Sequence, residues 1–203
     1  MKNLILRILI VLVLAAGAPL AAGADTWQID PGHTTVGFTV RHMTISSVRG
    51  QFDKVSGTIT ANGNDPASVA IEATVETASI DTRSADRDAD LKSANFLDVA
   101  KYPTMTFKST KITKGEGSKL KVEGNLTLHG VTKPVVFDVD VTPEVTNRGQ
   151  THKGVTASTK INRKDYGLNW NQTLEAGGVL VGDEVSIQVD MELKKVNPAP
   201  AAK

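Results

Sequence analysis

The chain has 203 residues, with 23 Lys or Arg against 22 Asp or Glu, so its formal net charge is only +1. A nearly neutral chain argues against nucleic acid as a partner, because that binding depends on neutralising phosphates. The absence of cysteine excludes disulfides, thiol catalysis and iron–sulfur ligation. Five Phe, two Trp and two Tyr are too few for an aromatic platform that stacks sugars or bases.

Residues 1–24 are predicted to be a cleaved signal peptide. Lys2 and Arg7 form a basic start, residues 4–14 are apolar apart from Arg7, and residues 22–24 show the small-x-small pattern of a signal-peptidase site. The apolar stretch is too short to serve well as a spanning helix, although an uncleaved N-terminal anchor is the alternative. We therefore expect a mature chain exported to a bacterial periplasm, with no stable membrane span after cleavage.

Eight stretches between residues 25 and 196 alternate apolar and polar residues with a period of two, the pattern of half-buried strands. In the last stretch, for example, Val185, Ile187 and Val189 share one face. After a short extended entry at 26–30 that ends at Pro31-Gly32, the strands are expected at 34–43, 48–61, 67–80, 104–114, 118–128, 134–146, 151–161 and 183–195. Eight strands close a barrel whose interior is either filled with side chains or holds one small ligand. The sequence therefore predicts one all-β domain, an extended eight-stranded antiparallel β-barrel with one short helix.

The stretch 48–61 predicts that the barrel is long and bent. Its apolar phase slips by one residue between Phe52 and Val55, which indicates a bulge or bend. Fourteen extended residues would span about 46 Å, which is longer than an ordinary strand. An interior of this shape suits a long, thin and apolar ligand.

Two segments lack the alternation. Residues 81–100 are densely charged, and we expect a helix over 84–94, capped by Ser84, followed by a loop through residues 96–103. Residues 163–182 contain four glycines and are expected to be irregular. Residues 115–117 are predicted to form a hairpin turn, and the tail 197–203, rich in Pro and Ala, to be disordered.

No catalytic residue and no metal site are predicted. The four histidines (33, 42, 129 and 152) are dispersed, without metal-ligand spacing. His42 lies on an apolar face, where a hydrogen-bonded structural role is favoured over ligand binding or catalysis. His129 precedes Gly130 and is expected to be a solvated turn residue.

The charged segments offer two further candidates. Arg83, Arg87 and Lys92 are candidates for an anionic head group such as a diphosphate. The favoured alternative is pairing with Asp86, Asp88 and Asp90 on the helix itself. Arg163, Lys164 and Asp165 form either a pocket rim or, as we prefer, a solvated corner.

Several motifs together resemble the YceI-like, polyisoprenoid-binding family. The matching stretches are 30–42 (DPGHTTVGFTVRH), 48–52 (VRGQF), the run from Arg87 to Phe107, 124–135 (GNLTLHGVTKPV) and 162–168 (NRKDYGL). They occur in the right order and cover about residues 30–195. The chain departs from the family pattern at Asp90, where a histidine is expected, and at Tyr166, where phenylalanine is commoner.

The resemblance implies a lipocalin-like barrel, usually periplasmic and often dimeric, that binds long isoprenoid lipids, quinones or other amphiphiles. It implies no established catalytic residues, and no cofactor beyond the lipid or quinone held as ligand. The two departures leave the identity of the head group open. They do not affect the expected binding of a lipid tail.

The function expected from residues and resemblance is that of a periplasmic carrier, not an enzyme, that holds an isoprenoid lipid or quinone. The expected ligand-binding residues are Val36, Phe38, Val40, His42, Ile71, Val75, Arg83, Arg87, Phe107, Leu126, Leu128, Phe137, Val139, Ile187 and Val189. One alternative is a redox partner or enzyme that uses a bound quinone beside His42 or Arg83. Another is a solid barrel that acts only through its surface. A homodimer is an expectation from the resemblance alone.

Overall fold

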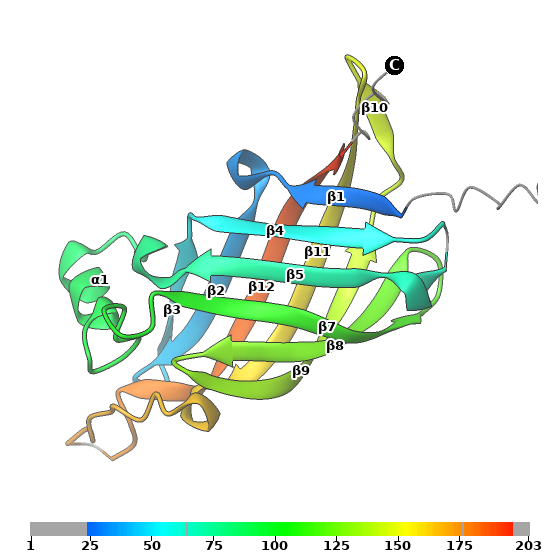
Figure 1. The fold of residues 1–203 in the computed structure, drawn as a ribbon. Coiled ribbons are helices and arrows are strands. Elements are labelled where there is room, and N and C mark those ends of the chain that lie inside the picture. Colours follow the sequence, from blue (N-terminus) through cyan, green and yellow to red (C-terminus); the bar gives the residue numbers. More distant parts are fainter. Residues whose placement is uncertain (1–23, 64, 176, 197–203) are drawn as a thin grey trace, which may run out of the picture.

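Strand β12 (Val181–Val196) joins the two ends of a continuous antiparallel sheet into a barrel (Figure 1). On one side it pairs with β11 (Gln150–Asn162) from Asn162↔Glu184 to His152↔Lys194. On its other side it pairs with β2 (Thr35–His42) and then with β1 (Asp25–Ile29). The structure is a computed structural model and describes residues 24–63, 65–175 and 177–196. The predicted signal peptide (apart from residue 24) and the predicted disordered tail lie outside these residues.

The ring contains eight strands, so the predicted closed barrel is confirmed. Its order is β11, β9, β8, β7, β5, β4, β1 and β12, and neighbouring strands are antiparallel. The remaining bounds are β4 (Val55–Ala61), β5 (Ala70–Glu76), β7 (Thr104–Lys114), β8 (Lys119–Leu128) and β9 (Val131–Val141).

Bends divide two of the predicted strands into two pieces each, and a third bend separates the first predicted strand from its extended entry, which forms a strand of its own. This entry is β1, and the 3-10 turn η1 (Pro31–His33) separates it from β2. The divided strands are β3 (Ser46–Phe52) with β4, and β5 with β6 (Ile80–Asp81) around η3 (Thr77–Ser79). The bend predicted between Phe52 and Val55 is confirmed, because both side chains are buried on either side of the break. There the backbone N–H of Asp53 donates to the carbonyl oxygen of Ser79, so two strands bend together.

The irregular segments gather at one end of the barrel, beside α1 (Ala85–Lys92) and η4 (Arg163–Tyr166) (Figure 1). The helix begins after Ser84 as expected, but the Ser84 side chain makes no capping hydrogen bond. Several boundaries differ from prediction. Residues 66–68 form the 3-10 turn η2, because the Asp65 carboxylate accepts from the Ala67 N–H, and the stretch 134–146 is divided before β10 (Val145–Asn147).

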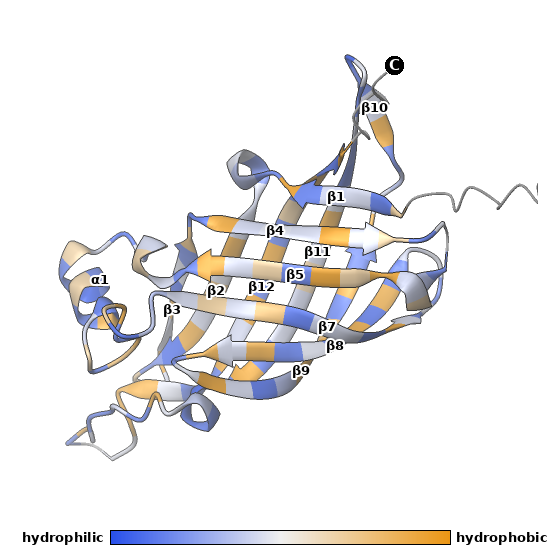
Figure 2. Cartoon of the chain, viewed as in Figure 1, coloured by the Kyte–Doolittle hydropathy of each residue, from blue (hydrophilic) through white to orange (hydrophobic). Residues whose placement is uncertain are grey.

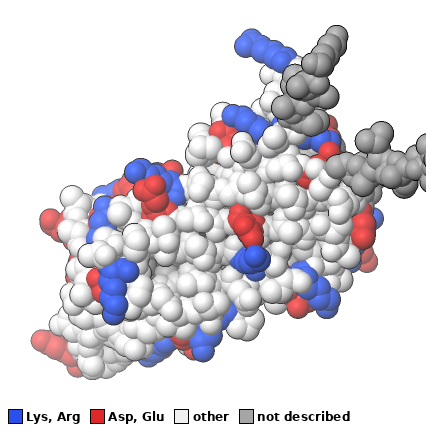
Figure 3. All heavy atoms as spheres, in the orientation of Figure 1, with Lys and Arg blue, Asp and Glu red and all other residues white. Residues whose placement is uncertain are grey.

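The two faces of the barrel wall differ in polarity. Apolar and polar residues alternate along the strands (Figure 2), and the apolar set faces inward. On the outside, lysines pair with carboxylates of neighbouring strands, as in Lys108–Glu72 and Lys160–Glu184. Red and blue side chains therefore lie side by side on the wall (Figure 3). Within the described chain, no helix has the length and apolar character needed to cross a membrane.

Candidate ligand-binding cavity

The interior of the barrel is hollow. It contains a cavity of about 390 Å³ that is lined from β1, β2, β4, β5, β7, β8, β9, β11 and β12. Among the described lining residues, only Thr106, Lys153 and Arg163 have polar side chains. This volume lies in the range of about 300–1,000 Å³ that is typical of small-molecule sites. The cavity can thus enclose an apolar molecule and offers very few polar partners to it.

Twelve of the fifteen residues expected from the sequence line this cavity, because alternation places them all on the inner face. They are Val36, Phe38, Val40, Ile71, Val75, Phe107, Leu126, Leu128, Phe137, Val139, Ile187 and Val189. Whether each of them touches a ligand remains a prediction.

His42, Arg83 and Arg87 do not line the cavity. His42 is the last residue of β2, where the strand turns into the hairpin to β3. Arg83 is exposed, with a left-handed backbone (φ 63°), and its N–H donates to Asp81. The Arg87 guanidinium donates to the hydroxyl and carbonyl oxygens of Thr82. These three residues therefore do not lie in the cavity, where they were predicted to bind a ligand.

The expected pairing of the helix charges is also wrong. The ion pairs of the described residues include none between Arg83, Arg87 or Lys92 and a carboxylate. Asp88 instead accepts hydrogen bonds from the N–H and hydroxyl of Thr82, at 2.9 and 2.6 Å. Asp90 accepts from the side chain of Asn95. Asp88 and Asp90 therefore bind residues of the neighbouring loops rather than the arginines.

Two pairs of aromatic rings project into the cavity. Phe38 and Phe52 lie with their ring centroids 5.8 Å apart, and Phe107 and Phe137 meet edge to face at 5.3 Å. The ring of Phe38 lies over Gly50 on the neighbouring strand, where an added Cβ would stand 2.5 Å from its Cζ. A glycine is therefore needed at position 50 for this ring position.

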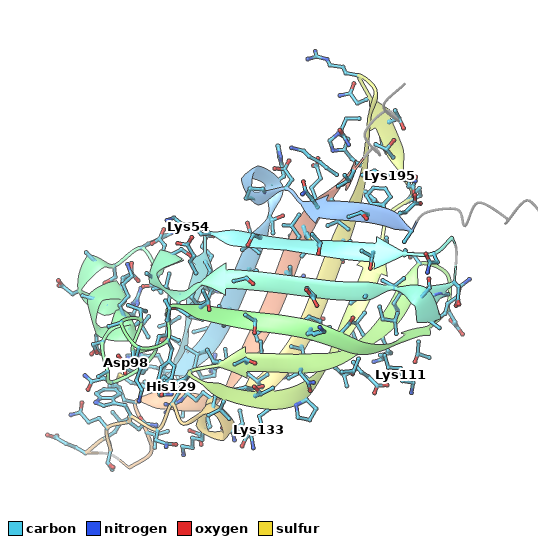
Figure 4. All side chains as sticks on the ribbon, in the orientation of Figure 1. Lys54, Asp98, Lys111, His129, Lys133 and Lys195 are labelled. Atoms are coloured by element: carbon cyan, nitrogen blue, oxygen red, sulfur yellow. The ribbon has the colours of Figure 1, made fainter. Side chains whose placement is uncertain are left out.

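At the α1 end, the cavity is closed by residues from the irregular segments. Leu91 of α1 and the loop residues Phe96, Leu97 and Leu168 line it there, and the Phe96 ring packs on Trp170 with centroids 5.1 Å apart. The sequence analysis did not select these residues, because a cap made of loops and a short helix leaves no periodic signal. His129 also lies at this end (Figure 4). It lies in the turn before Gly130 as expected, but it is half-buried rather than solvated, because it packs edge to face on Tyr102 at 4.5 Å.

Arg163 is buried, and the preferred interpretation of it as part of a solvated corner is wrong. Its side chain is only 4% exposed, and it donates hydrogen bonds to the carbonyl oxygens of Gly182 and Leu168. Burial lowers the pKa of Arg163, and the neighbouring Asp183 carboxylate opposes this effect. Its Nη2 lies 3.7 Å from Asp183. The residue thus ties the chain after η4 to the start of β12.

At the opposite end of the cavity, two lysines lie close to the buried ring of Trp27, and of these Lys153 lines the cavity. The Lys153 ammonium lies 3.7 Å from the centroid of the Trp27 ring, and that of Lys195 lies 5.5 Å from it. Lys195 also forms a 2.8 Å ion pair with Asp25, and this hydrogen bond raises the pKa of Lys195. Figure 4 labels Lys195 at the end of the barrel that carries β1 and β10, away from His129. Sequence analysis missed Lys153, although it lies in phase with the lining residues of β11.

One further cluster lies outside the cavity lining. The ligand atoms of Asp30, His33 and Glu192 lie within 4.8 Å of one another, close enough to hold a metal ion. However, the same Asp30 oxygen accepts from Lys194 at 2.7 Å and from His33 at 2.8 Å. These two bonds lower the pKa of Asp30 to about 2. The Lys194 ammonium already neutralises the carboxylate that a metal ion would need.

A closed antiparallel barrel around an apolar cavity defines a class of small β-barrel proteins with a ligand-sized interior. The YceI-like domain profile matches residues 27–193, and the chain belongs to this family. Protein YceI of Salmonella newport is 38% identical over 170 residues, which cover 82% of this chain and 87% of the relative. A UPF0312 protein of Staphylococcus aureus is 33% identical over 168 residues, covering 82% and 95% of the two chains.

Solved structures share the fold. The YCEI protein of Campylobacter jejuni has a TM-score of 0.64 at 29% identity, covering 77% of this chain and 90% of its own. Burkholderia cenocepacia BcnA has a TM-score of 0.71 at 22% identity, covering 81% and 98%. A polyisoprenoid binding domain from Saccharophagus degradans has a TM-score of 0.65 at 17% identity, covering 84% and 98%. The last two identities are too low to indicate more than the fold.

Proposed function

We propose that this protein is an exported binding protein that holds a long-chain isoprenoid lipid, or a similar amphiphile, inside its barrel. The observation that carries this proposal is the apolar cavity of about 390 Å³, to which all eight strands of the ring contribute side chains. A barrel that acted only through its surface would gain stability by filling this space, because unfilled apolar volume costs packing energy.

The energy of binding would come mainly from burial of the lipid tail. Apolar surface contributes about 25 cal/mol per Å², so several hundred Å² of buried tail support micromolar or tighter binding after the costs of association. The choice of an isoprenoid as the tail rests on the resemblance of the sequence motifs to the polyisoprenoid-binding family, and the polyisoprenoid binding domain from Saccharophagus degradans shares the fold.

The proposed location is the periplasm. The basic start, the apolar stretch and the small residues at 22–24 support export through a cleaved signal peptide. Mass spectrometry of the intact protein from its native host tests this, because cleavage after Ala24 predicts a mature chain that starts at Asp25. A mature protein that retains residues 1–24 would contradict it.

The quinone-dependent redox function has no comparable support. It required His42 or Arg83 beside the head group of a bound quinone, and neither residue lines the cavity. A quinone held only as a ligand is still covered by the proposed binding function.

Mass spectrometry of an organic extract tests the proposal most directly. The protein is purified from its native host without detergent, extracted with chloroform and methanol, and compared with a sample denatured and washed before extraction. We expect a long-chain amphiphile in near-stoichiometric amount only in the folded sample. Absence of any amphiphile, together with no binding of added isoprenoid alcohol or quinone, would overturn the proposal.

A further inference from the structure

Lys153 extends into the barrel at one end of a row of apolar lining residues on β11. It lies on β11 in phase with Val155, Ala157 and Ile161, all of which line the cavity. Side chains two residues apart on a strand share a face, so the Lys153 stem follows the inner wall. The side chain is 21% exposed, which places its ammonium group where the cavity meets solvent.

The Lys153 ammonium has donors to spare. Its nearest carboxylate, Glu144, lies 3.5 Å away and is itself half exposed, whereas a strong charged hydrogen bond measures about 2.7–2.9 Å. Its other partner is the face of Trp27, at 3.7 Å from the ring centroid, which attracts the charge but accepts no strong hydrogen bond. An ammonium has three donors, and these two contacts leave room for an acceptor from a ligand.

The other cations around the cavity are engaged more fully. Lys195 pairs with Asp25 at 2.8 Å. Arg163, at the opposite end, donates to backbone carbonyls and is almost completely buried. Lys153 is therefore the lining residue, among those described, that offers a positive charge to both the cavity and the solvent.

We propose that Lys153 binds the head group of the amphiphile in the cavity, and that this head group is anionic, a phosphate or a carboxylate. The inference rests on the proposed function and names the ligand class that the site prefers. The tail would run from Lys153 toward Ile161, a distance of about 27 Å along β11 at the usual rise per residue. The head would stay at the solvent-facing mouth, where a charged group avoids the cost of full burial.

The test compares probes that share one tail and differ only in the head. Binding of geranylgeranyl phosphate, geranylgeranoic acid and the neutral geranylgeraniol to the delipidated protein is measured by displacement of a fluorescent lipid, well below the aggregation concentration of each probe. We expect at least one anionic probe to bind about tenfold or more tightly than the alcohol, since a hydrogen bond to a charged group is worth a factor of about 10 to 100. Whether the phosphate or the acid binds more tightly distinguishes the two sources of the charge.

The variants Lys153→Met and Lys153→Gln remove the charge and keep a side chain of similar length. We expect both to lose the preference for the anionic probe while the affinity for geranylgeraniol stays within about twofold. Lys160→Met is the matched control, because Lys160 lies on the same strand but on the outer face, paired with Glu184 at 2.9 Å. It should bind all three probes as the unmodified protein does.

The outcomes separate this inference from the function on which it rests. Equal binding of the anionic probes and the alcohol to the unmodified protein would overturn the role of Lys153 and leave the binding function standing. An anionic preference that survives in both Lys153 variants would also overturn it. Failure of every probe to bind would overturn both proposals.

Discussion

The ring of Phe107 on β7 lies against the backbone of Gly124 on β8, so that a Cβ atom on this glycine would stand 2.5 Å from Cε2 of the ring. The same ring meets Phe137 edge to face. One missing side chain therefore sets how far an aromatic ring extends into the cavity, and the relation repeats between Phe38 and Gly50.

Gly124→Ala is expected to destabilise the protein by about 1 to 3 kcal/mol, the usual cost of overpacking, because Phe107 has to leave its position over β8. The displaced ring should also narrow the cavity and weaken lipid binding. Urea unfolding and lipid displacement measure the two effects. Gly37→Ala is the control, because Gly37 also lines the cavity but an added Cβ would meet its nearest atom at an ordinary 3.5 Å. Equal stability of the two variants would contradict this account of the ring.

Ala157→Trp should block the cavity from within. Ala157 is a small lining residue on β11 between Val139 and Val189, so a large side chain there has open space to enter. We expect lipid binding to fall at least tenfold while the far-UV circular dichroism spectrum is unchanged. The neighbouring Ser158 is exposed on the outer face, and Ser158→Trp should bind lipid normally. Unimpaired binding by Ala157→Trp would show that ligands bind elsewhere.

Arg163→Met is expected to loosen the cap at the α1 end. The substitution leaves the carbonyl oxygens of Leu168 and Gly182 without their donor, and unsatisfied buried groups cost roughly 1–3 kcal/mol each. We expect a loss of about 2 to 4 kcal/mol in unfolding free energy and faster amide hydrogen exchange over residues 167–181. Arg163→Lys should recover only part of this loss, because a lysine cannot reach two carbonyls with a planar fork. Exchange rates that stay unchanged in this segment would argue against the role of Arg163.

Asp30 should contribute to acid sensitivity. Its pKa is lowered from 3.8 to about 2, mainly by the hydrogen bonds from Lys194 and His33. A lowered pKa means that the folded state favours the carboxylate, so this stabilisation is present above about pH 4 and is lost as the pH falls toward 2. We expect Asp30→Asn to lower stability at neutral pH and to flatten the pH dependence of unfolding between these limits. Lys194→Met should instead raise the pKa of Asp30, which carboxyl chemical shifts would detect.

The sequence predicts the barrel well because each strand of its wall has one face toward the apolar interior and one toward solvent, so apolar and polar residues alternate along it. Most inward residues are apolar and most outward residues are polar, so twelve lining residues follow from phase alone. The bend between Phe52 and Val55 is visible for the same reason, since a break that keeps both residues buried has to shift the phase.

The two polar ends of the cavity could not be predicted in this way. Lys153 is in phase with its neighbours on β11, but a pattern of apolar residues does not include a charged side chain, although its long aliphatic stem can line an apolar wall. Arg163 is buried through contacts with Gly182 and Leu168, which depend on how the segment after η4 folds back. Neither arrangement leaves a periodic signal, and both depend on contacts between distant parts of the chain.

The position of β12 has a consequence for how the chain folds. Among the described strands it comes last in chain order, yet it pairs with both β11 and the early strands β1 and β2. Until it arrives, both edges of the sheet stay open, and pairing across the full length of the chain favours slow folding. A chain truncated before Val181 would therefore expose unpaired edges that promote aggregation, and the barrel can close only once residues 181–196 are available for pairing.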